Sequence, residues 1–463
     1  MIKRNLKKIQ EMCSGHGLKL EDENLLIEGV STDSRKIYSN QLFIPLVGDN
    51  FNGHEFLDVA MKNGAIASLW NESEPLPNVD FPIILVPDTL VALQNLAKSY
   101  RGELDTKVIG ITGSNGKTST KDILASLLKT QYKTHKTLGN FNNHIGLPLT
   151  ILNMDEDTEM AVIEIGISEF GEASLLTSIA KPDVALITNI GEAHLEGLKT
   201  RENIARAKME ILEGLKTNGL FLYPGDEPIL KEMVKAFSKD YEVKSFGSET
   251  FNDFQPETKF INETGVSFFF KNMFSPTFFL PMLGKHQISN ATAAIAIARH
   301  LGISFDNIEK GLLKVEATGM RNELVEGNGF TILNDSYKSN PSSVLAALDT
   351  LYFMENYNQK IVVLGDMLGL GDEEVKMHEE IGSGIDPKQV DYLFTIGSIS
   401  RNIAKKARLN LGDDNVFSYD NKSDLMEGIK RIIKPNALIL IKASRAFELE
   451  ELVEQLTDKS FSL

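Results

Sequence analysis

A glycine-rich segment at residues 108–120 contains the residues best suited to chemistry. It reads Val-Ile-Gly-Ile-Thr-Gly-Ser-Asn-Gly-Lys-Thr-Ser-Thr, so a buried strand is followed by a glycine turn and a Lys-Thr pair that opens a helix. Glycine lets backbone N–H groups approach phosphate oxygens, a lysine supplies positive charge to them, and a threonine hydroxyl there suits Mg²⁺. Ile111 stands where the common phosphate loop has its first glycine, and a chance glycine turn is the alternative interpretation. The order of elements favours a nucleotide-phosphate loop, most simply for ATP, made of Thr112, Gly113, Ser114, Asn115, Gly116, Lys117, Thr118 and Ser119.

Two further polar side chains follow predicted strands. Glu164 lies near the end of the strand expected at 160–165, and His194 comes just beyond the one expected at 184–189. In open α/β sheets, ligands collect beyond the carboxyl ends of strands. A carboxylate is a usual Mg²⁺ ligand, whereas histidine indicates a more specialised site. Each residue alone favours a capping carboxylate or a locally bonded histidine, but beside the glycine loop the pair favours metal binding.

Alternating strands and helices must position these groups. We expect a short strand at 83–87 and a helix at 89–100, and an alanine-rich helix at 284–300. Alternation of this kind predicts an α/β fold of doubly wound, mainly parallel sheets. We expect three domains: a smaller N-terminal α/β domain at 1–100, a central phosphate-loop domain at 101–318, and a C-terminal Rossmann-like domain at 319–463. The main strands are predicted at 108–112, 160–165, 184–189, 219–223, 330–334, 361–365, 392–396 and 438–442.

Composition excludes several classes of protein. The 463 residues carry a net charge of −16, which disfavours binding to a nucleic-acid backbone. The single cysteine, Cys13, permits no intramolecular disulfide, in keeping with a reducing cytoplasm. We expect no signal peptide, because no apolar run follows the basic start, and no membrane insertion, because no apolar stretch is long enough.

With these residues in view, the chain resembles the Mur ligase superfamily, whose members form amide bonds at the expense of ATP. The loop at 112–118, Glu164 and the Ala-His-Leu-Glu segment around His194 match in order. The resemblance then assigns Lys208 to the Mg²⁺ site as a carbamate, although a solvated helix lysine is the plain alternative. It implies that Asn290 contacts the adenine and that Asp335 contacts the ribose of ATP. It also implies that Arg321, from the last domain, reaches the γ-phosphate when the open domains close.

Several segments are similar to the branch of the superfamily that joins D-alanyl-D-alanine to UDP-N-acetylmuramoyl-tripeptide. The resemblance implies UDP-substrate binding by Ser31, Ser34, Arg35, Asn140, Asn142, Asn143 and His144, and contacts on the dipeptide side by Tyr337, Asn340 and Arg445. Composition alone would make the residues at 31–35 a Ser/Asp turn with a surface arginine, and asparagines are ordinary loop residues. Gly369 and Ala443 depart from the pattern, where glutamate and glycine are common.

The resemblance therefore implies an ATP-dependent ligase of peptidoglycan precursor synthesis in the bacterial cytoplasm. It would act through an acyl phosphate, with two Mg²⁺ ions, as a monomer. Either lysine or diaminopimelate is compatible as the third residue of the tripeptide. The alternatives are a tripeptide-forming Mur ligase, a folylpolyglutamate synthase-like ligase, and a non-catalytic nucleotide-binding scaffold. The last is disfavoured because a scaffold has no need of Lys117, Glu164, His194 and Arg321 together.

Overall fold

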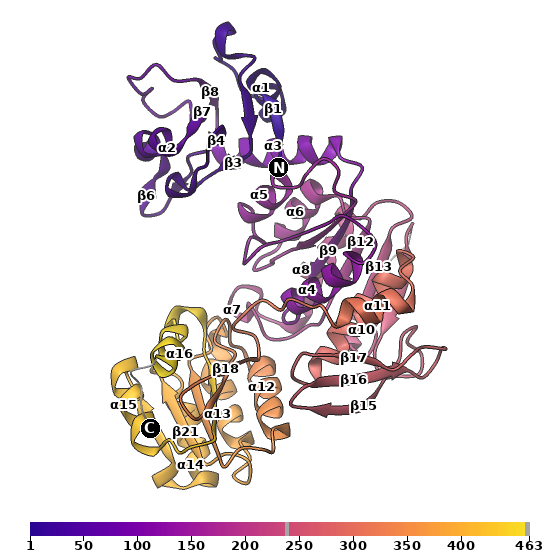
Figure 1. Cartoon of the computed structure of the whole chain (residues 1–463), viewed down its shortest axis with the longest axis vertical. Coiled ribbons are helices and arrows are strands. Elements are labelled where there is room, and N and C mark those ends of the chain that lie inside the picture. Colours follow the sequence, from indigo (N-terminus) through magenta and orange to yellow (C-terminus); the bar gives the residue numbers. More distant parts are fainter. Residues whose placement is uncertain (237–239, 459–463) are drawn as a thin grey trace.

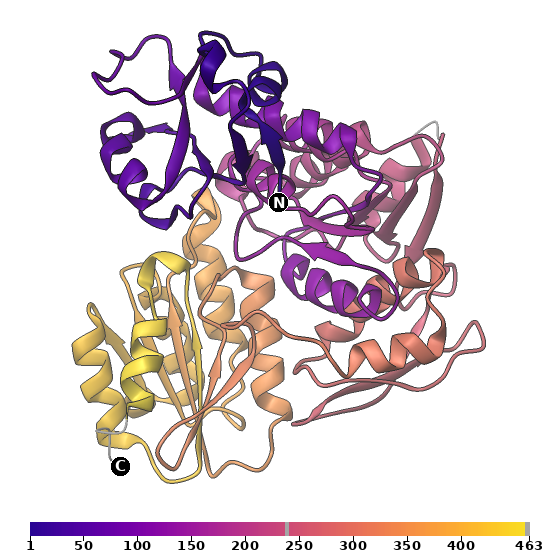
Figure 2. The ribbon, with the colours of Figure 1, turned by 45° about the horizontal axis from the view of Figure 1, so that its top comes forward.

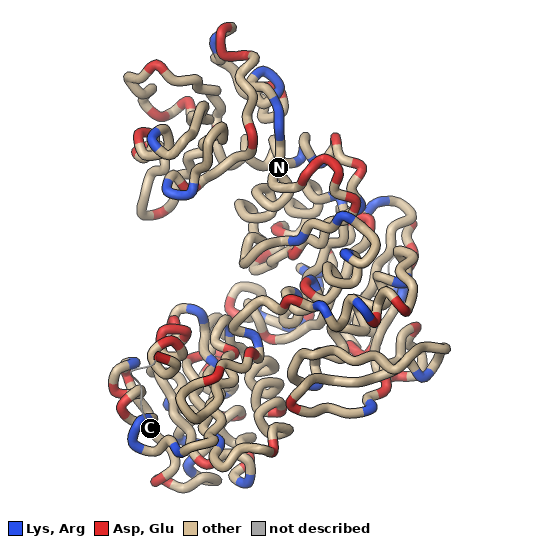
Figure 3. Tube along the Cα trace, in the orientation of Figure 1, with Lys and Arg blue, Asp and Glu red and all other residues tan. Residues whose placement is uncertain are grey.

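The computed structural model describes residues 1–236 and 240–458. Each of three successive regions of the chain is built around a mainly parallel sheet, and the central one lies between the other two (Figure 1). Residues 237–239 of the expected central domain and 459–463 of the expected C-terminal domain lie outside the described residues, and the three domain ranges remain predictions. Acidic and basic residues are interspersed in all three regions, and neither kind is confined to one of them (Figure 3).

The central sheet is parallel throughout its described strands. Its order is β10 (Thr134–Lys136), β11 (Met160–Glu164), β9 (Lys107–Thr112), β12 (Val184–Ile187), β13 (Leu220–Pro224) and β14 (Glu242–Phe246). The predicted doubly wound parallel sheet is confirmed, and the strands that carry Glu164 and precede His194 flank β9 on either side. The carboxyl ends of these three strands therefore meet at one edge, as the sequence predicted.

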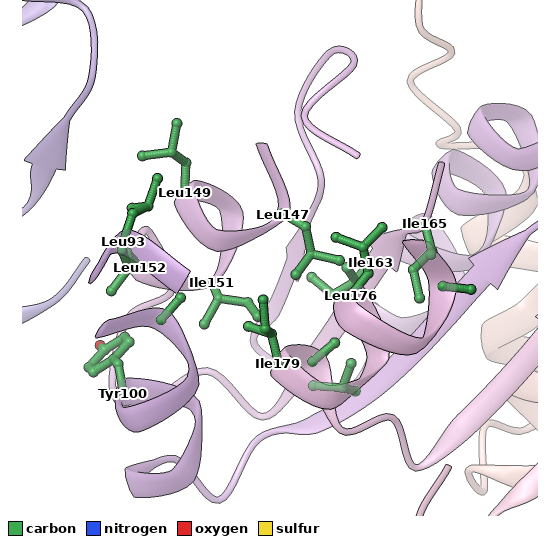
Figure 4. Close-up of a cluster of buried hydrophobic side chains, with 14 of the residues drawn as sticks. Leu93, Tyr100, Leu147, Leu149, Ile151, Leu152, Ile163, Ile165, Leu176 and Ile179 are labelled. Carbon is green, nitrogen blue, oxygen red and sulfur yellow. The ribbon is translucent and has the colours of Figure 1, made fainter. Parts of the chain in front are cut away.

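The two faces of this sheet have separate cores, because side chains alternate along a strand. Ile109 and Ile111 of β9 pack with α4 (Lys117–Leu128), α10 (His286–His300) and α11 (Phe305–Leu312). The opposite face packs on α5 (Gly146–Leu152), α6 (Glu172–Ala180) and α8 (Arg201–Met209) and continues into the N-terminal region through α3 (Thr89–Glu103). Figure 4 shows this shared cluster, in which Leu93 and Tyr100 of α3 lie beside α5. The remaining helices of this region are α7 (Leu195–Leu198) and α9 (Pro228–Ala236).

An antiparallel sheet in the middle region was not predicted. It consists of β15 (Pro256–Asn262), β16 (Gly265–Phe270) and β17 (Phe278–Leu280). The reason is local: β15 and β16 are joined by only Glu263 and Thr264, and so short a connection allows only antiparallel pairing. Its phenylalanines pack onto α10 and α11, extending the core on that face.

The C-terminal sheet resembles the central one in being wound on both sides. Its order is β18 (Glu323–Glu326), β19 (Thr331–Asn334), β23 (Ala437–Lys442), β20 (Gln359–Gly365), β21 (Tyr392–Ile396) and β22 (Val416–Tyr419), and only the edge pair β18–β19 is antiparallel. The helices α12 (Pro341–Phe353), α13 (Glu374–Gly384) and α14 (Arg401–Leu411) cover one face, and α15 (Lys422–Ile432) and α16 (Glu450–Thr457) cover the other. The expected Rossmann-like sheet is confirmed, with an added antiparallel edge.

The N-terminal region is smaller. The strands β3 (Val30–Ser31), β4 (Gln41–Phe43), β7 (Ala65–Asn71) and β8 (Ile83–Val86) form a parallel sheet. Beside it lie the pairs β1 (Lys3–Asn5) with β2 (Leu26–Glu28) and β5 (Val47–Gly48) with β6 (Phe51–Asn52), and the helices α1 (Leu6–Cys13) and α2 (Leu57–Asn63). Figure 2 shows this region next to the central sheet. None of the described helices has the length and apolar character needed to cross a membrane.

Candidate active site

The glycines of the phosphate loop are required by close packing. Gly113 has φ +150°, and a Cβ there would lie 1.8 Å from Thr188 Oγ1. Gly116 has φ +78°, and a Cβ there would lie 2.4 Å from Asn290 Oδ1. Only glycine combines this backbone conformation with so little room. The turn thus brings backbone N–H groups to the start of α4, where a helix N-terminus attracts anions.

Lys117 begins α4 and folds back over the loop. Its Nζ donates to the Gly113 carbonyl oxygen at 2.7 Å. Desolvation, with the nearby charge of Lys338, lowers the pKa of Lys117 to about 8. A polyanion bound in the loop would restore the ordinary protonated ammonium, because an opposite charge favours the charged form.

Glu164 is held by two neighbours at the end of β11. Thr118 Oγ1 donates to its Oε2 at 2.9 Å, and Asn142 Nδ2 donates to its Oε1 at 2.9 Å. The carboxylate is 3% exposed. Within residues 1–236 and 240–458, no three His, Cys, Asp or Glu side chains gather as a metal-binding group. A hydroxyl and one carboxylate beside a phosphate loop nevertheless fit Mg²⁺, which commonly takes one or two carboxylates together with substrate phosphates.

His194 follows β12 in a left-handed backbone conformation, with φ +66°. Its Nε2 lies 3.1 Å from Nζ of Lys338, which comes from the C-terminal region. Desolvation, followed by the charges of Lys338, Lys117 and Lys208, lowers the pKa of His194 to about 3. The imidazole is therefore neutral near pH 7, which is the form that can bind a metal.

Lys208 lies on α8 and is almost fully buried, with 1% exposure. Desolvation lowers its pKa well below the ordinary lysine value, and the charges of Lys117 and Lys338 act in the same direction. Lys208 does not line the cavity described below, but its charge is coupled to residues that do. Its amine is suited to react as a nucleophile, because the neutral form is favoured.

Arg321 enters from the segment between the two large sheets. Its guanidinium stacks on the Tyr337 ring, 4.3 Å from the centroid, and its buried Nε has no hydrogen-bond partner among the described residues. The flanking Met320 and Asn322 both have left-handed backbones, with φ +60° and +48°. Such strain is retained where the surroundings hold it, often at functional sites.

The central and C-terminal regions meet directly at the site. Asn340 caps α12 by accepting from Ser343 N and also exchanges hydrogen bonds with Asn115 of the phosphate loop, at 2.8 and 3.2 Å. The backbone N–H of Glu196 donates to the Gly369 carbonyl oxygen at 3.0 Å. The C-terminal region is therefore attached to the phosphate loop by side-chain contacts and to α7 by a backbone contact.

These groups surround a cavity of about 480 Å³. The predicted site residues on its walls are Ser114, Asn115, Gly116, Lys117, Thr118, Ser119, Asn140, Asn142, Asn143, Glu164, His194, Asn290, Arg321, Asp335 and Tyr337. The central and C-terminal regions therefore build one cavity between them, and predicted nucleotide, metal and acceptor residues converge on it.

Other predicted residues lie elsewhere. The turn at Ser31–Arg35 is satisfied internally, since Asp33 accepts from Arg35 Nε at 2.9 Å and from Arg35 Nη2 at 3.0 Å. Arg445 is exposed and pairs with Glu450. The predicted residues absent from the cavity walls are Thr112, Gly113, Ser31, Ser34, Arg35, His144, Lys208, Asn340 and Arg445. Their assigned roles stay predictions.

Among the cavity-lining residues that sequence reasoning missed, Lys338, His286 and Glu172 carry ionisable groups next to the predicted site residues. Lys338 had a signal available, since a lysine only four residues beyond a strand end has the same placement that singled out His194. His286 and Glu172 carried no such signal. They begin α10 and α6, and only the packing of those helices brings their first turns to the cavity.

The fold and site together define a class: a three-region protein with a phosphate-loop, doubly wound central sheet. Comparison with known families matches the Mur ligase family, catalytic domain, at residues 26–101, the Mur ligase middle domain at 111–298, and the Mur ligase, glutamate ligase domain, at 320–445. The chain is 47% identical over all 463 residues, covering 100% of both chains, to the UDP-N-acetylmuramoyl-tripeptide–D-alanyl-D-alanine ligase of Bacillus subtilis strain 168. The protein belongs to the Mur ligase family.

Solved structures agree with this assignment. MurF from Acinetobacter baumannii superimposes with a TM-score of 0.88 at 28% identity, covering 99% of this chain and 100% of the other. MurF ligase from Thermotoga maritima, solved in complex with ADP, has a TM-score of 0.80 at 29% identity and covers 93% and 97%. The three-domain Mur ligase fold expected from the sequence is thereby confirmed.

Proposed function

We propose that this protein joins D-alanyl-D-alanine to UDP-N-acetylmuramoyl-tripeptide, with conversion of ATP to ADP and phosphate. The observation that carries the proposal is the single cavity in which Lys117, Glu164, His194 and Arg321 converge from two sheets. The names of the relatives favour this substrate pair over that of a tripeptide-forming or folylpolyglutamate synthase-like ligase. The reaction belongs to peptidoglycan precursor synthesis, and we expect it in the cytoplasm.

The chemistry requires activation, because a carboxylate is a poor acylating group in water. The terminal carboxylate of the tripeptide attacks the γ-phosphorus of ATP, ADP leaves, and an acyl phosphate forms. The amine of the dipeptide, in its neutral form, then attacks the carbonyl carbon. The resulting tetrahedral intermediate expels phosphate and loses a proton to give the amide.

The first step brings two anions together, the carboxylate and the triphosphate, so catalysis depends on positioning and charge. Lys117 extends from the phosphate loop toward the β- and γ-phosphates, and Arg321 approaches from the other side of the cavity. Their charges offset the repulsion between triphosphate and carboxylate. Backbone N–H groups of the loop bind the phosphates.

The donor set fits Mg²⁺. Thr118 and Glu164 would hold one ion, and His194 with a modified Lys208 would hold a second. The ions would neutralise negative charge on the phosphate and acyl oxygens. Lys208 fits carbamylation, since its lowered pKa favours the neutral amine that CO₂ requires. The product is an anion in place of a cation, which suits a metal ligand.

The acceptor is expected to extend from the cavity toward the N-terminal sheet. Asn140, Asn142 and Asn143 line the near side, and Ser31, Ser34 and Arg35 would hold the uridine diphosphate. Asn290 and Asp335 would contact adenine and ribose, and Tyr337 the dipeptide. We expect the domains to close around the substrates and the protein to act as a monomer.

The test is Mg-ATP-dependent phosphate release by the purified protein, with the tripeptide precursor and the dipeptide supplied together or singly. Release only with both, and a product heavier by the dipeptide less water, supports the proposal. Release with the dipeptide-stage precursor and a diamino acid would assign the tripeptide-forming step instead. No turnover with either pair, even with added bicarbonate to carbamylate Lys208, would favour the scaffold.

A further inference from the structure

Lys338 is a cation in the cavity to which the proposed mechanism assigns no task. It follows β19, at the edge where the C-terminal region faces the phosphate loop, and its side chain lines the same cavity as Lys117 and Arg321. The residue as a whole is exposed, and it stands on the wall of the cavity.

The backbone on both sides of Lys338 is fixed. Lys442 Nζ donates to the Lys338 carbonyl oxygen at 2.9 Å and pairs with Asp335 at 2.6 Å. Two residues on, Asn340 bonds to Asn115 of the phosphate loop. The main chain is therefore anchored to β23 and to the phosphate loop. The movable part of Lys338 is its four-carbon side chain, which carries a rotatable point charge.

The ammonium forms no ion pair with a carboxylate of the described residues, although the negative charge of Glu164 acts on it from across the cavity. Among the ion pairs of residues 1–236 and 240–458, none includes Lys338, Lys117 or Arg321. The hydrogen-bond partner of Lys338 Nζ is the Nε2 of His194, at 3.1 Å. A neutral imidazole cannot balance a positive charge, and three such cations around one cavity repel each other. An anion placed between them would satisfy all three.

From this geometry we propose that Lys338 is a phosphate-binding residue, and that its ammonium turns from His194 to the phosphoryl group that is transferred. The proposal rests on the function proposed above and deepens it. The C-terminal region then presents two cations, Arg321 and Lys338, to the γ-phosphate, and afterwards to the acyl phosphate. The same turn leaves His194 Nε2 free for another partner.

The proposed role of Lys338 differs from that of Lys117 because Lys338 would distinguish ATP from ADP. Lys117 sits on the loop and contacts phosphates that ATP and ADP share. Lys338 reaches the cavity from the opposite wall, so its partner is the phosphate that only ATP carries. Removing it should therefore weaken binding of the triphosphate more than that of the diphosphate.

The experiment uses the full-length protein with Mg²⁺ and compares the wild type with K338M, K338R and K376M. Lys376 is an exposed lysine of α13 that pairs with Glu373, so K376M removes an equal charge from the same region away from the cavity. Calorimetry measures the affinity for ADP and for a hydrolysis-resistant ATP analogue. Steady-state phosphate release with both substrates gives kcat and KM.

We expect K338M to lose roughly ten- to hundredfold in affinity for the ATP analogue, the range of one hydrogen bond to a charged group. Its ADP affinity should change less than about threefold. Its kcat should fall by roughly the same factor as the analogue affinity. K338R should keep most of the affinity for the ATP analogue and most of kcat, and K376M should match the wild type. Thermal unfolding of K338M should occur at or above the wild-type midpoint, because like charges are separated.

Three results would overturn the proposal. They are equal losses for ADP and the analogue, a loss confined to KM for the UDP-linked substrate, or no loss at all. The nucleotide measurements need neither acceptor nor dipeptide, so they decide the role of Lys338 even if the wild type fails to turn over. Failure of wild-type turnover would instead count against the proposed function.

Discussion

The two walls of the cavity are built in different ways. The phosphate-loop wall is local: Gly113, Gly116 and Lys117 lie within five residues, and Lys117 bonds to its own loop. The facing wall gathers Arg321 and Lys338 with Lys442, which is more than 100 residues distant along the chain. The first wall is preformed by short-range sterics, whereas the second depends on how the C-terminal region docks.

This difference suggests a division of labour. A local loop holds its geometry whenever the central sheet is folded, so it suits binding of the nucleotide. Cations carried by a separate region can approach the phosphates or leave them together when that region moves, so they suit the transfer step. Substitutions on the phosphate-loop wall should therefore weaken binding of ATP and ADP together, whereas substitutions on the facing wall should lower the rate and leave ADP affinity nearly unchanged.

The largest effect is expected for Lys117→Met. It removes the charge from the preformed wall, and we expect kcat to fall roughly a thousandfold, at the upper end for loss of one preorganised group. ATP and ADP affinities should fall together, because both nucleotides carry phosphates that the loop binds. Steady-state kinetics and calorimetry check this, with a far-ultraviolet spectrum as the control for folding. A variant that loses rate but keeps both affinities would contradict the role of the preformed wall.

Arg321→Ala should have the next largest effect. We expect kcat to fall roughly a hundredfold while ATP affinity changes less than about threefold, since the guanidinium acts at transfer and shares the charge with Lys338. Arg321→Lys serves as the conservative variant and should recover part of the rate. Equal losses in rate and in ADP affinity would place Arg321 on the binding side and remove the distinction between the walls.

The pH dependence of nucleotide binding tests the first wall alone. The pKa of Lys117 is lowered to about 8 in the free protein, and bound phosphates should raise it. Above pH 8 the nucleotide-bound protein should therefore hold more protons than the free protein. Affinity for Mg-ADP should therefore fall by about tenfold between pH 7 and pH 9. Calorimetry in buffers of different ionisation enthalpy should show proton uptake at pH 9 and little at pH 6.5. Proton release at pH 9 would contradict the assignment.

Arg35→Ala should have the smallest effect, because it lies outside both walls. Its guanidinium is exposed and pairs with Asp33 within the same turn. An exposed pair contributes little to stability, so the free energy of unfolding should stay close to that of the wild type. If Arg35 binds the uridine diphosphate, KM for the UDP-linked substrate should rise several-fold at unchanged kcat. A rise in KM for ATP instead would contradict that role.

Much of the phosphate-loop wall was predictable from sequence. A strand, two glycines and Lys-Thr are contiguous, so their geometry follows from local backbone preferences. Glu164 and His194 were also predictable, because the carboxyl ends of adjacent parallel strands meet at one edge. The antiparallel sheet of β15, β16 and β17 was not predicted, since its aromatic strands lie in a block for which only a mainly parallel, doubly wound sheet was expected.

The sequence by itself determined the doubly wound sheets, the phosphate loop and the residues at the strand ends, because each depends on neighbours in the chain or on strand order. Only the tertiary structure decided that Asn340 bonds to the phosphate loop, that Arg321 stacks on Tyr337, and that Lys338 reaches His194. The contacts of Asn340 and Lys338 join the C-terminal region to the central one, and that of Arg321 joins the two ends of the β18–β19 pair. The first two depend on how whole domains pack, and no local pattern of residues encodes that packing.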